Sequence, residues 1–268
     1  MRYFICLSYN GSAFCGWQIQ DNANSVQQEV QKALSILLRE SVSVTGAGRT
    51  DSGVNAVNYI AHFDSQTLIQ NTKHTLYKLN AILPKEICIS SIFQVHEQAH
   101  ARFDATSRTY KYFIHTAKDP FNARFSYFIP PGKLDFEKMN EAARYFLGEH
   151  DFSSLEKVNG GNKTSICNVT EARWSSVKAF PDFDGTAGRR SDSDEFYGST
   201  HCVFTVTANR FLRNMVRAMV GSLLEVGFGK QEPEWVAAML AKKDRSAAGH
   251  SVPGNALFLY EIKYPYLP

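Results

Sequence analysis

The stretch VSVTGAGRTDSGVNAVNYIAHF, residues 42–63, places two β-type runs on either side of a glycine-rich loop. Residues 42–44 and 57–63 are rich in β-branched and aromatic side chains, which favour strands. Between these runs, three glycines within eight positions allow sharp backbone turns and a close approach by a ligand. The stretch therefore predicts a strand, a tight loop and a second strand.

Outward from this stretch, strand-like and helix-like patterns are mixed along the whole chain. Further strands are expected at residues 3–9, 87–95, 109–115, 169–177, 203–208 and 257–264. Helices are expected from Ser25, around 73–79, from Asp135, over 209–226 and over 233–241. Because these elements follow no strict βαβ rhythm, we expect an α+β fold with a largely antiparallel mixed sheet.

The chain is expected to form two similar α+β halves, residues 1–104 and 105–268, as ferredoxin-like sandwich units with helices packed on the sheet. Sequence identity between the halves is too weak to define a repeat. The stretch 181–198 is rich in Asp, Gly, Ser and Arg and holds few apolar residues, which is typical of a long hairpin loop.

Composition places the 268-residue chain among globular proteins, with 44% hydrophobic and 21% charged residues. The formal net charge of +3 permits a polyanionic partner without requiring one. Five cysteines, an odd number with no CxxC pair, argue against a disulfide framework and a zinc knuckle. With no recognisable signal peptide and no apolar run long enough to span a bilayer, we expect a soluble cytoplasmic protein.

The glycine-rich loop contains Arg49 and Asp51, whose side chains would point the same way on an extended backbone. A guanidinium beside a carboxylate keeps it ionised, which suits a nucleophile or a stabiliser of positive charge and does not suit a general acid. A structural ion pair in a tight turn would have the same sequence. The glycine spacing matches neither GxGxxG nor a P-loop, so a nucleotide cradle is not supported.

The second feature of the sequence is a set of basic residues in its later part and around Tyr110. Arg210, Arg213 and Arg217 would form one stripe on the predicted helix 209–226, opposite its apolar face. Such a stripe is commonly a solvated face, but three arginines without an intervening acid also suit phosphate groups. Arg108 and Lys111 flank Tyr110, and aromatic residues interleaved with bases suit RNA loops.

Several motifs together resemble those of one family. The segment GRTDSGV (48–54) is similar to the GRTD-x-GV signature of the tRNA pseudouridine synthase A family. Further similar blocks follow the family's order along nearly the whole chain: FCGWQIQ (14–20), HARFDA (100–105), RTYKY (108–112), FLRNMVR (211–217) and LFL (257–259). The chain departs from the family in having Asn55 where histidine is usual and Ala256 where glycine is usual.

This resemblance implies an isomerase that converts uridine to pseudouridine at positions 38, 39 and 40 of the tRNA anticodon stem-loop. It implies a homodimer, a basic RNA-binding cleft between the halves, and no metal or cofactor. Asp51 would be the catalytic carboxylate, acting on the sugar or base as a nucleophile or taking a proton from the ribose. Arg49 would pair with Asp51 or fill the space left by the extruded base.

The remaining site residues follow partly from the resemblance and partly from the basic residues described above. Tyr110 would stack on the extruded base and help to remove its C5 proton, although Tyr112 points to the same face of the predicted strand. Arg213 would contact phosphate or instead pair with the carboxylate. Gln18 and Leu257 would shape the pocket, or serve in ordinary packing. The RNA backbone would meet Arg108, Lys111, Arg210 and Arg217.

Two alternatives stay open. Residues 96–100, HEQAH, are a literal HExxH, in which His96 and His100 would bind zinc and Glu97 would act as base, but a strand-like run precedes them. A non-catalytic RNA-binding protein of the same fold is the second alternative, with Asn55 as its mark.

Overall fold

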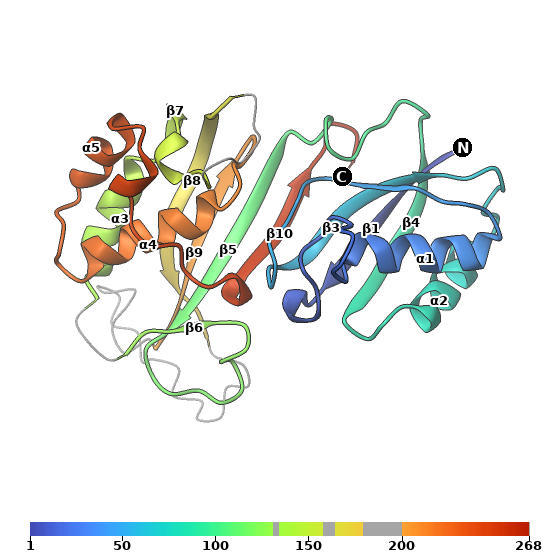
Figure 1. Ribbon diagram of the computed structural model, residues 1–268, viewed down its shortest axis with the longest axis horizontal. Helices are drawn as coiled ribbons and strands as arrows, with labels where there is room; N and C mark the ends of the chain where they lie inside the picture. Colours follow the sequence, from blue (N-terminus) through green and yellow to red (C-terminus); the bar gives the residue numbers. More distant parts are fainter. Residues whose placement is uncertain (131–133, 158–163, 179–199, 268) are drawn as a thin grey trace. The chain divides into compact units, whose positions relative to one another are not determined.

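The computed structural model describes residues 1–130, 134–157, 164–178 and 200–267 (Figure 1). Within these ranges there are ten strands and five α-helices, and the strand pairs are mixed but mostly antiparallel. The predicted α+β class is therefore confirmed. The stretch 181–198, predicted to be a long loop, lies outside the described residues. None of the described helices combines the length and the apolar composition needed to cross a membrane.

The chain divides into two compact units. Unit 1 comprises Met1–Arg108 together with Phe258–Pro268, and unit 2 comprises Thr109–Leu257. The expected halves were 1–104 and 105–268, so the structure differs most in the closing strand. All of that strand except Leu257 belongs to unit 1, where it pairs in parallel with another strand, with Phe258 opposite Asn55.

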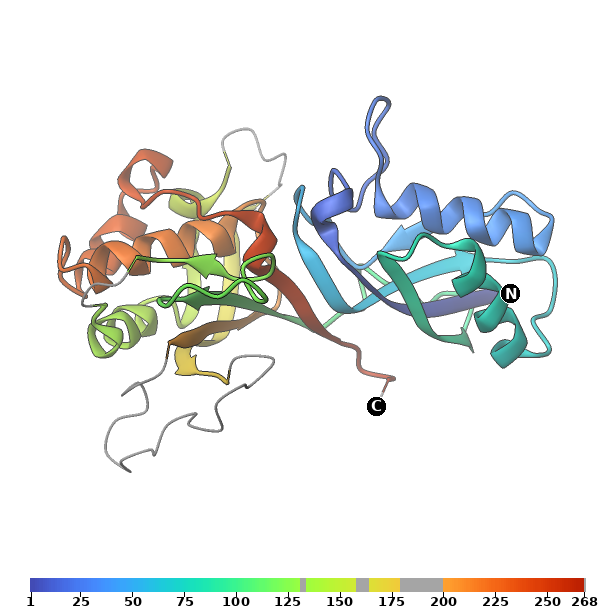
Figure 2. The ribbon, with the colours of Figure 1, turned by 90° about the horizontal axis from the view of Figure 1, so that it is seen from below.

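Unit 1 is built on the strand order β4-β1-β3-β10, with β2 paired to β3. Its strands are β1 (Arg2–Tyr9), β2 (Val44–Gly46), β3 (Asn55–Asp64), β4 (Ile87–Val95) and β10 (Leu257–Lys263). Helices α1 (Val26–Leu38) and α2 (Thr72–Ile82) pack on each other and on β2 and β4 (Figure 2). As predicted, Ser25 caps α1, because its side chain accepts a hydrogen bond from the Gln28 amide at 3.3 Å.

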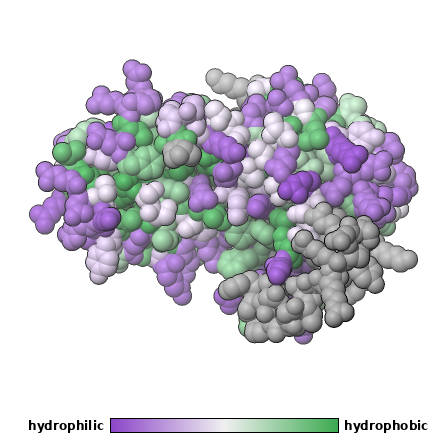
Figure 3. All heavy atoms as spheres, turned by 180° about the vertical axis from the view of Figure 1, so that it is seen from behind, coloured by the Kyte–Doolittle hydropathy of each residue, from purple (hydrophilic) through white to green (hydrophobic). Residues whose placement is uncertain are grey.

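Unit 2 has the strand order β5-β9-β8-β7, with β6 paired to β5. The strands are β5 (Ser107–His115), β6 (Tyr127–Phe128), β7 (Gly148–Asp151), β8 (Ile166–Ser176) and β9 (His201–Ala208). The helices are α3 (Phe136–Arg144), α4 (Met215–Gly227) and α5 (Trp235–Ala241). The side chains of α4 are almost all buried. On the face of the protein seen in Figure 3, hydrophilic residues are spread widely among hydrophobic ones.

The prediction of one helix over residues 209–226 was wrong at its start, since α4 begins only at Met215. Asn214 before it has a φ of 70°, and a left-handed residue cannot continue a right-handed helix. Asn209 is instead tied to β8, where its side chain accepts a hydrogen bond from the Asn168 amide at 2.9 Å. Arg210 and Arg213 therefore share no helical face with the arginine of α4.

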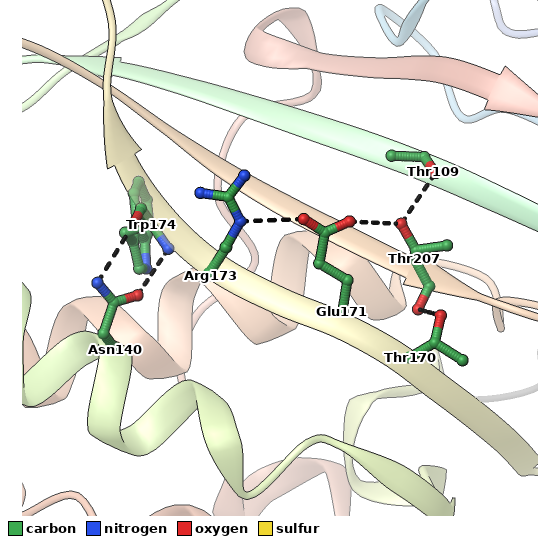
Figure 4. Close-up of polar contacts among 7 residues, drawn as sticks. All are labelled: Thr109, Asn140, Thr170, Glu171, Arg173, Trp174 and Thr207. Carbon is green, nitrogen blue, oxygen red and sulfur yellow. Dashed lines mark hydrogen bonds and ion pairs between the residues drawn. The ribbon is translucent and has the colours of Figure 1, made fainter.

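Two polar contacts tie α3 to the sheet of unit 2 (Figure 4). The Asn140 side chain accepts from the Trp174 amide at 2.7 Å and donates to the Trp174 carbonyl at 3.3 Å. On the opposite face of β8, the Glu171 carboxylate accepts from Arg173 and from Thr207 on β9. The asparagine thus satisfies strand groups of a tryptophan that is 1% exposed.

We predict that Asn140→Ala lowers the free energy of unfolding by about 2 kcal/mol, because two buried backbone groups lose their partners. Urea denaturation measures this change. Glu141→Ala, at an exposed position of the same helix, serves as the control and should change stability by less than about 0.5 kcal/mol. Equal effects of the two substitutions would contradict the role given to Asn140.

In unit 1, His62 of β3 is 5% exposed and its Nδ1 accepts a hydrogen bond from the Ala101 amide at 3.1 Å. Burial, with smaller contributions from the charges of Arg2 and His100, lowers the pKa of His62 from 6.5 to about 4. The folded protein therefore holds this imidazole neutral at pH values where the unfolded chain would protonate it.

We predict that acidification destabilises the protein through His62. The free energy of unfolding should fall as the pH drops from about 6.5 to about 4, by about 3 kcal/mol in all, because only the unfolded state gains this proton. Denaturation curves at successive pH values measure the loss. In His62→Gln, which keeps an acceptor but cannot titrate, the slope in this window should be shallower by one proton.

Candidate active site

The loop that carries Asp51 connects β2 to β3, and a neighbouring segment of unit 1, residues 10–17, holds its backbone. Before Asp51, the Thr50 carbonyl accepts from the Trp17 amide at 3.3 Å. After it, the Gly53 amide donates to the Phe14 carbonyl at 3.4 Å. The carboxylate thus projects from a loop that is anchored on both sides.

Segment 10–17 passes so close to the loop that a glycine is required at position 16. Gly16 has a φ of +88°, and a Cβ built on it would lie 2.3 Å from the Thr50 carbonyl oxygen. Only a residue without a side chain can adopt this conformation at this distance. The motifs FCGWQIQ and GRTDSGV, which are more than 25 residues apart in the chain, therefore form one structural feature.

An aromatic cluster made of Tyr9, Trp17 and Tyr59 supports the loop. All three side chains are buried, and the ring centroids of Trp17 and Tyr59 are 4.2 Å apart. The Tyr59 hydroxyl donates to the Gly48 carbonyl, and the Tyr9 hydroxyl lies 2.9 Å from Thr50 Oγ1. Sequence reasoning missed both tyrosines, because each lies in a strand and has the pattern of an ordinary core aromatic.

Asp51 itself is partly exposed, and its carbonyl accepts from the Val54 amide at 3.2 Å, which closes a tight turn. Arg49 is exposed. Gln18 is also exposed and follows Trp17, so it lies one residue from the hydrogen bond that fixes Thr50. In unit 1 the structure therefore brings Gln18 and the loop with Arg49 and Asp51 together.

Asn55, one of the departures from the family pattern, has a structural role. Its side chain is 2% exposed, and its Oδ1 accepts from the Gly11 amide at 2.9 Å. This bond joins the start of β3 to segment 10–17. The amide oxygen thus satisfies a backbone donor next to the loop, as a neutral imidazole nitrogen also does.

Arg108, predicted to contact the RNA backbone, donates to protein carbonyls. Its guanidinium bonds the carbonyls of Ala105 at 3.0 Å, Arg102 at 2.7 Å and Ala47 at 3.3 Å. Ala47 is 2% exposed and lies at the start of the Asp51 loop. Arg108 therefore ties this loop to the chain segment that leads into β5.

In unit 2, the structure separates the two candidate tyrosines of β5. Tyr112 is fully buried, and its hydroxyl donates to the Pro253 carbonyl at 3.0 Å. Burial raises the pKa of Tyr112 far above its usual value. Tyr110 is only partly buried, and its ring meets that of Phe211 edge to face at 5.0 Å. Tyr112 is therefore a core residue, and Tyr110 stays the candidate for the site.

The three arginines near α4 differ in their surroundings. Arg210 donates to the Thr164 carbonyl at 2.9 Å, and Arg217 Nε donates to the Val252 carbonyl at 2.7 Å. Arg213 is exposed. The other site residues predicted in unit 2 are Lys111, which is partly buried, and Leu257, which is 5% exposed.

The HExxH segment has the wrong conformation for a zinc hydrolase. Residues 96–100 follow β4 as a turn and not as a helix, so His96 and His100 are not one helical turn apart. His100 Nδ1 accepts from the amides of Arg102 and Phe103 at 3.1 and 3.2 Å. Among the described residues, no group of three or more His, Cys, Asp or Glu could hold a metal ion.

Comparison with known proteins agrees with the motifs. A sequence model of the family described as tRNA pseudouridine synthase matches residues 142–265. The tRNA pseudouridine synthase A of Bacteroides thetaiotaomicron is 47% identical over 264 residues, which cover 98% of this chain and 91% of the relative. The protein of the same name from Parabacteroides distasonis is 47% identical over 264 residues, covering 98% and 96%.

A more distant relative, tRNA pseudouridine synthase A of Aliivibrio salmonicida, is 36% identical over 267 residues, covering 99% of this chain and 93% of the relative. The similarity thus extends over both units and includes the Asp51 loop. The chain belongs to the tRNA pseudouridine synthase A family, whose members are isomerases.

Proposed function

We propose that this protein converts uridine to pseudouridine at positions 38, 39 and 40 of the tRNA anticodon stem-loop, with Asp51 as the catalytic carboxylate. The observation that carries the proposal is the Asp51 loop. It presents a partly exposed carboxylate on a backbone that is anchored before and after it. Membership of the family supplies the reaction class and the kind of substrate.

The reaction is an isomerisation that needs no external group. The bond between uracil N1 and ribose C1′ breaks, the base turns, and a bond from C5 to C1′ forms. The C5 proton leaves and N1 gains a proton, so the atoms balance. Asp51 assists either by adding to the sugar or base, or by taking a ribose proton, and the anchored loop keeps the carboxylate in position during these steps.

The target base must leave its stack, at a cost of a few kcal/mol. Tyr110 is proposed to stack on the extruded uracil, and its contact with Phe211 fixes the ring for this purpose. Arg49, which is exposed, is proposed to fill the space that the base leaves. Gln18, Arg213 and Leu257 are proposed to line the pocket.

The wider substrate contact is also a proposal. Lys111, Arg210 and Arg217 are proposed to contact the RNA backbone, each through the part of its side chain that solvent reaches. We further propose that the protein acts as a homodimer in the cytoplasm. The homodimer rests on the family resemblance, and the cytoplasm also on the cysteine pattern of the sequence.

We predict that Asp51→Ala lowers pseudouridine formation by roughly 1000-fold or more, because it removes the carboxylate that assists the bond changes. The measurement is pseudouridine content in an anticodon stem-loop RNA with uridines at positions 38–40, together with RNA affinity. Affinity should stay within about threefold, since Asp51 is not among the residues proposed to contact the RNA backbone. Glu97→Ala, at an exposed acid of the HExxH segment, is the control and should keep full activity.

Activity retained in Asp51→Ala would contradict the assignment of this carboxylate. Tight RNA binding by an unmodified protein that forms no pseudouridine on any tRNA would favour the non-catalytic RNA-binding alternative.

We predict that Arg213 and Arg108 differ in the salt dependence of RNA binding. Arg213→Ala, which removes an exposed cation, should reduce the slope of log affinity against log salt concentration by about 1. Arg108→Ala should leave the slope nearly unchanged, because its guanidinium already donates to three protein carbonyls. Titrations of labelled RNA at several salt concentrations measure both slopes, and an equal reduction would restore Arg108 as a phosphate contact.

A further inference from the structure

We infer that Tyr9 and Tyr59 are positioning residues of the reaction, which fix Asp51 by holding the backbone immediately before it. The inference rests on the proposed role of Asp51. Both tyrosines act through hydroxyl groups that bond the loop and lie beneath it, so neither is assigned a contact with the substrate.

Tyr59 holds the peptide groups of one loop residue. Its side chain is 0% exposed, and its hydroxyl donates to the Gly48 carbonyl and accepts from the Gly48 amide at 3.4 Å. The ring packs against Trp17, and Gly46 leaves room for the hydroxyl, since a Cβ at Gly46 would lie 2.0 Å from it. With phenylalanine in place of Tyr59, the Gly48 carbonyl and the Gly48 amide would both lose their hydrogen bond to the hydroxyl.

Tyr9 holds the residue next to Asp51. It is the last residue of β1, and its hydroxyl lies 2.9 Å from Thr50 Oγ1. Tyr9 is 4% exposed and Thr50 is 8% exposed, so water competes little for this bond. Because β1 lies between β3 and β4 in the sheet, the bond links Thr50 to the interior of unit 1.

The two hydroxyls matter because the loop contains several glycines, whose backbone has many accessible conformations. The Gly53 amide and the Asn55 side chain hold the loop after Asp51. Before Asp51, the Thr50 carbonyl accepts from the Trp17 amide, and the two hydroxyls add side-chain bonds to Gly48 and Thr50. Without them the carboxylate could move relative to the bound sugar. A displacement of about 1 Å from the reactive geometry costs roughly 100-fold in rate.

The test compares Tyr9→Phe and Tyr59→Phe, which keep the rings and remove only the hydroxyls. Each should lower the single-turnover rate of pseudouridine formation at saturating RNA by about 10- to 100-fold. RNA affinity should stay within about twofold, because no proposed RNA contact is removed. Thermal unfolding of each variant shows that it is folded.

Tyr3→Phe is the matched control. Tyr3 also lies on β1, is 1% exposed, and accepts a hydrogen bond from the Ile69 amide at 3.0 Å, far along the strand from Tyr9. Tyr3→Phe should lower Tm as much as Tyr9→Phe and Tyr59→Phe do, while the single-turnover rate of pseudouridine formation stays at the wild-type value. A rate loss shared by all three variants would mean a general structural effect and would overturn the inference.

A double-mutant comparison tests whether Tyr9 acts through its bond to Thr50. The variant with Tyr9→Phe and Thr50→Val together should be no slower than the slower single variant, because both changes remove the same bond. Multiplied effects, or wild-type rates in Tyr9→Phe and Tyr59→Phe, would overturn the inference. If Asp51→Ala is as active as the unmodified protein, the proposed function fails and the inference with it. If the reaction depends on Asp51 but its rate is unchanged in both tyrosine variants, the inference fails and the proposed function stands.

Discussion

The close backbone contact between segment 10–17 and the loop after β2 is the constraint on which the candidate site depends. At Gly16 these two segments of the chain are too near for any side chain, and the carbonyl that Gly16 meets belongs to Thr50. A tight approach of this kind satisfies backbone groups that a loop would otherwise leave to water. It anchors the backbone next to Asp51, and the hydroxyls of Tyr9 and Tyr59 add side-chain bonds to the same loop.

Hydrogen bonds to backbone carbonyl groups give several of the basic residues a structural role. The guanidiniums of Arg108, Arg210 and Arg217 each donate to at least one backbone carbonyl. Arginine suits this task because its rigid fork presents five donors and stays charged. Carbonyl groups of the fold therefore help to set the direction of these guanidiniums, which a count of Lys and Arg in the sequence cannot show.

Much of the fold was predictable because it follows from local pattern. The strand β4 was expected at its observed bounds, and the cap at Ser25 was expected from the spacing to Gln28. The start of α4 was not, because the apolar spacing of residues 212–226 continues through Asn214. The helix begins only after Asn214 because this residue has a left-handed backbone conformation. The apolar spacing does not reveal that conformation.

By itself, the sequence determined the α+β class, the order of the elements and the family motifs, because these depend on side-chain type and on spacing along the chain. Tertiary structure alone decided which of two like residues has which role. Tyr112 became a core residue through its bond to Pro253, and Tyr9 and Tyr59 came to lie beneath the Asp51 loop. The physical reason is distance along the chain. The partners Tyr9 and Thr50 are 41 residues apart, and no local pattern encodes a hydrogen bond that forms only when the strands have paired.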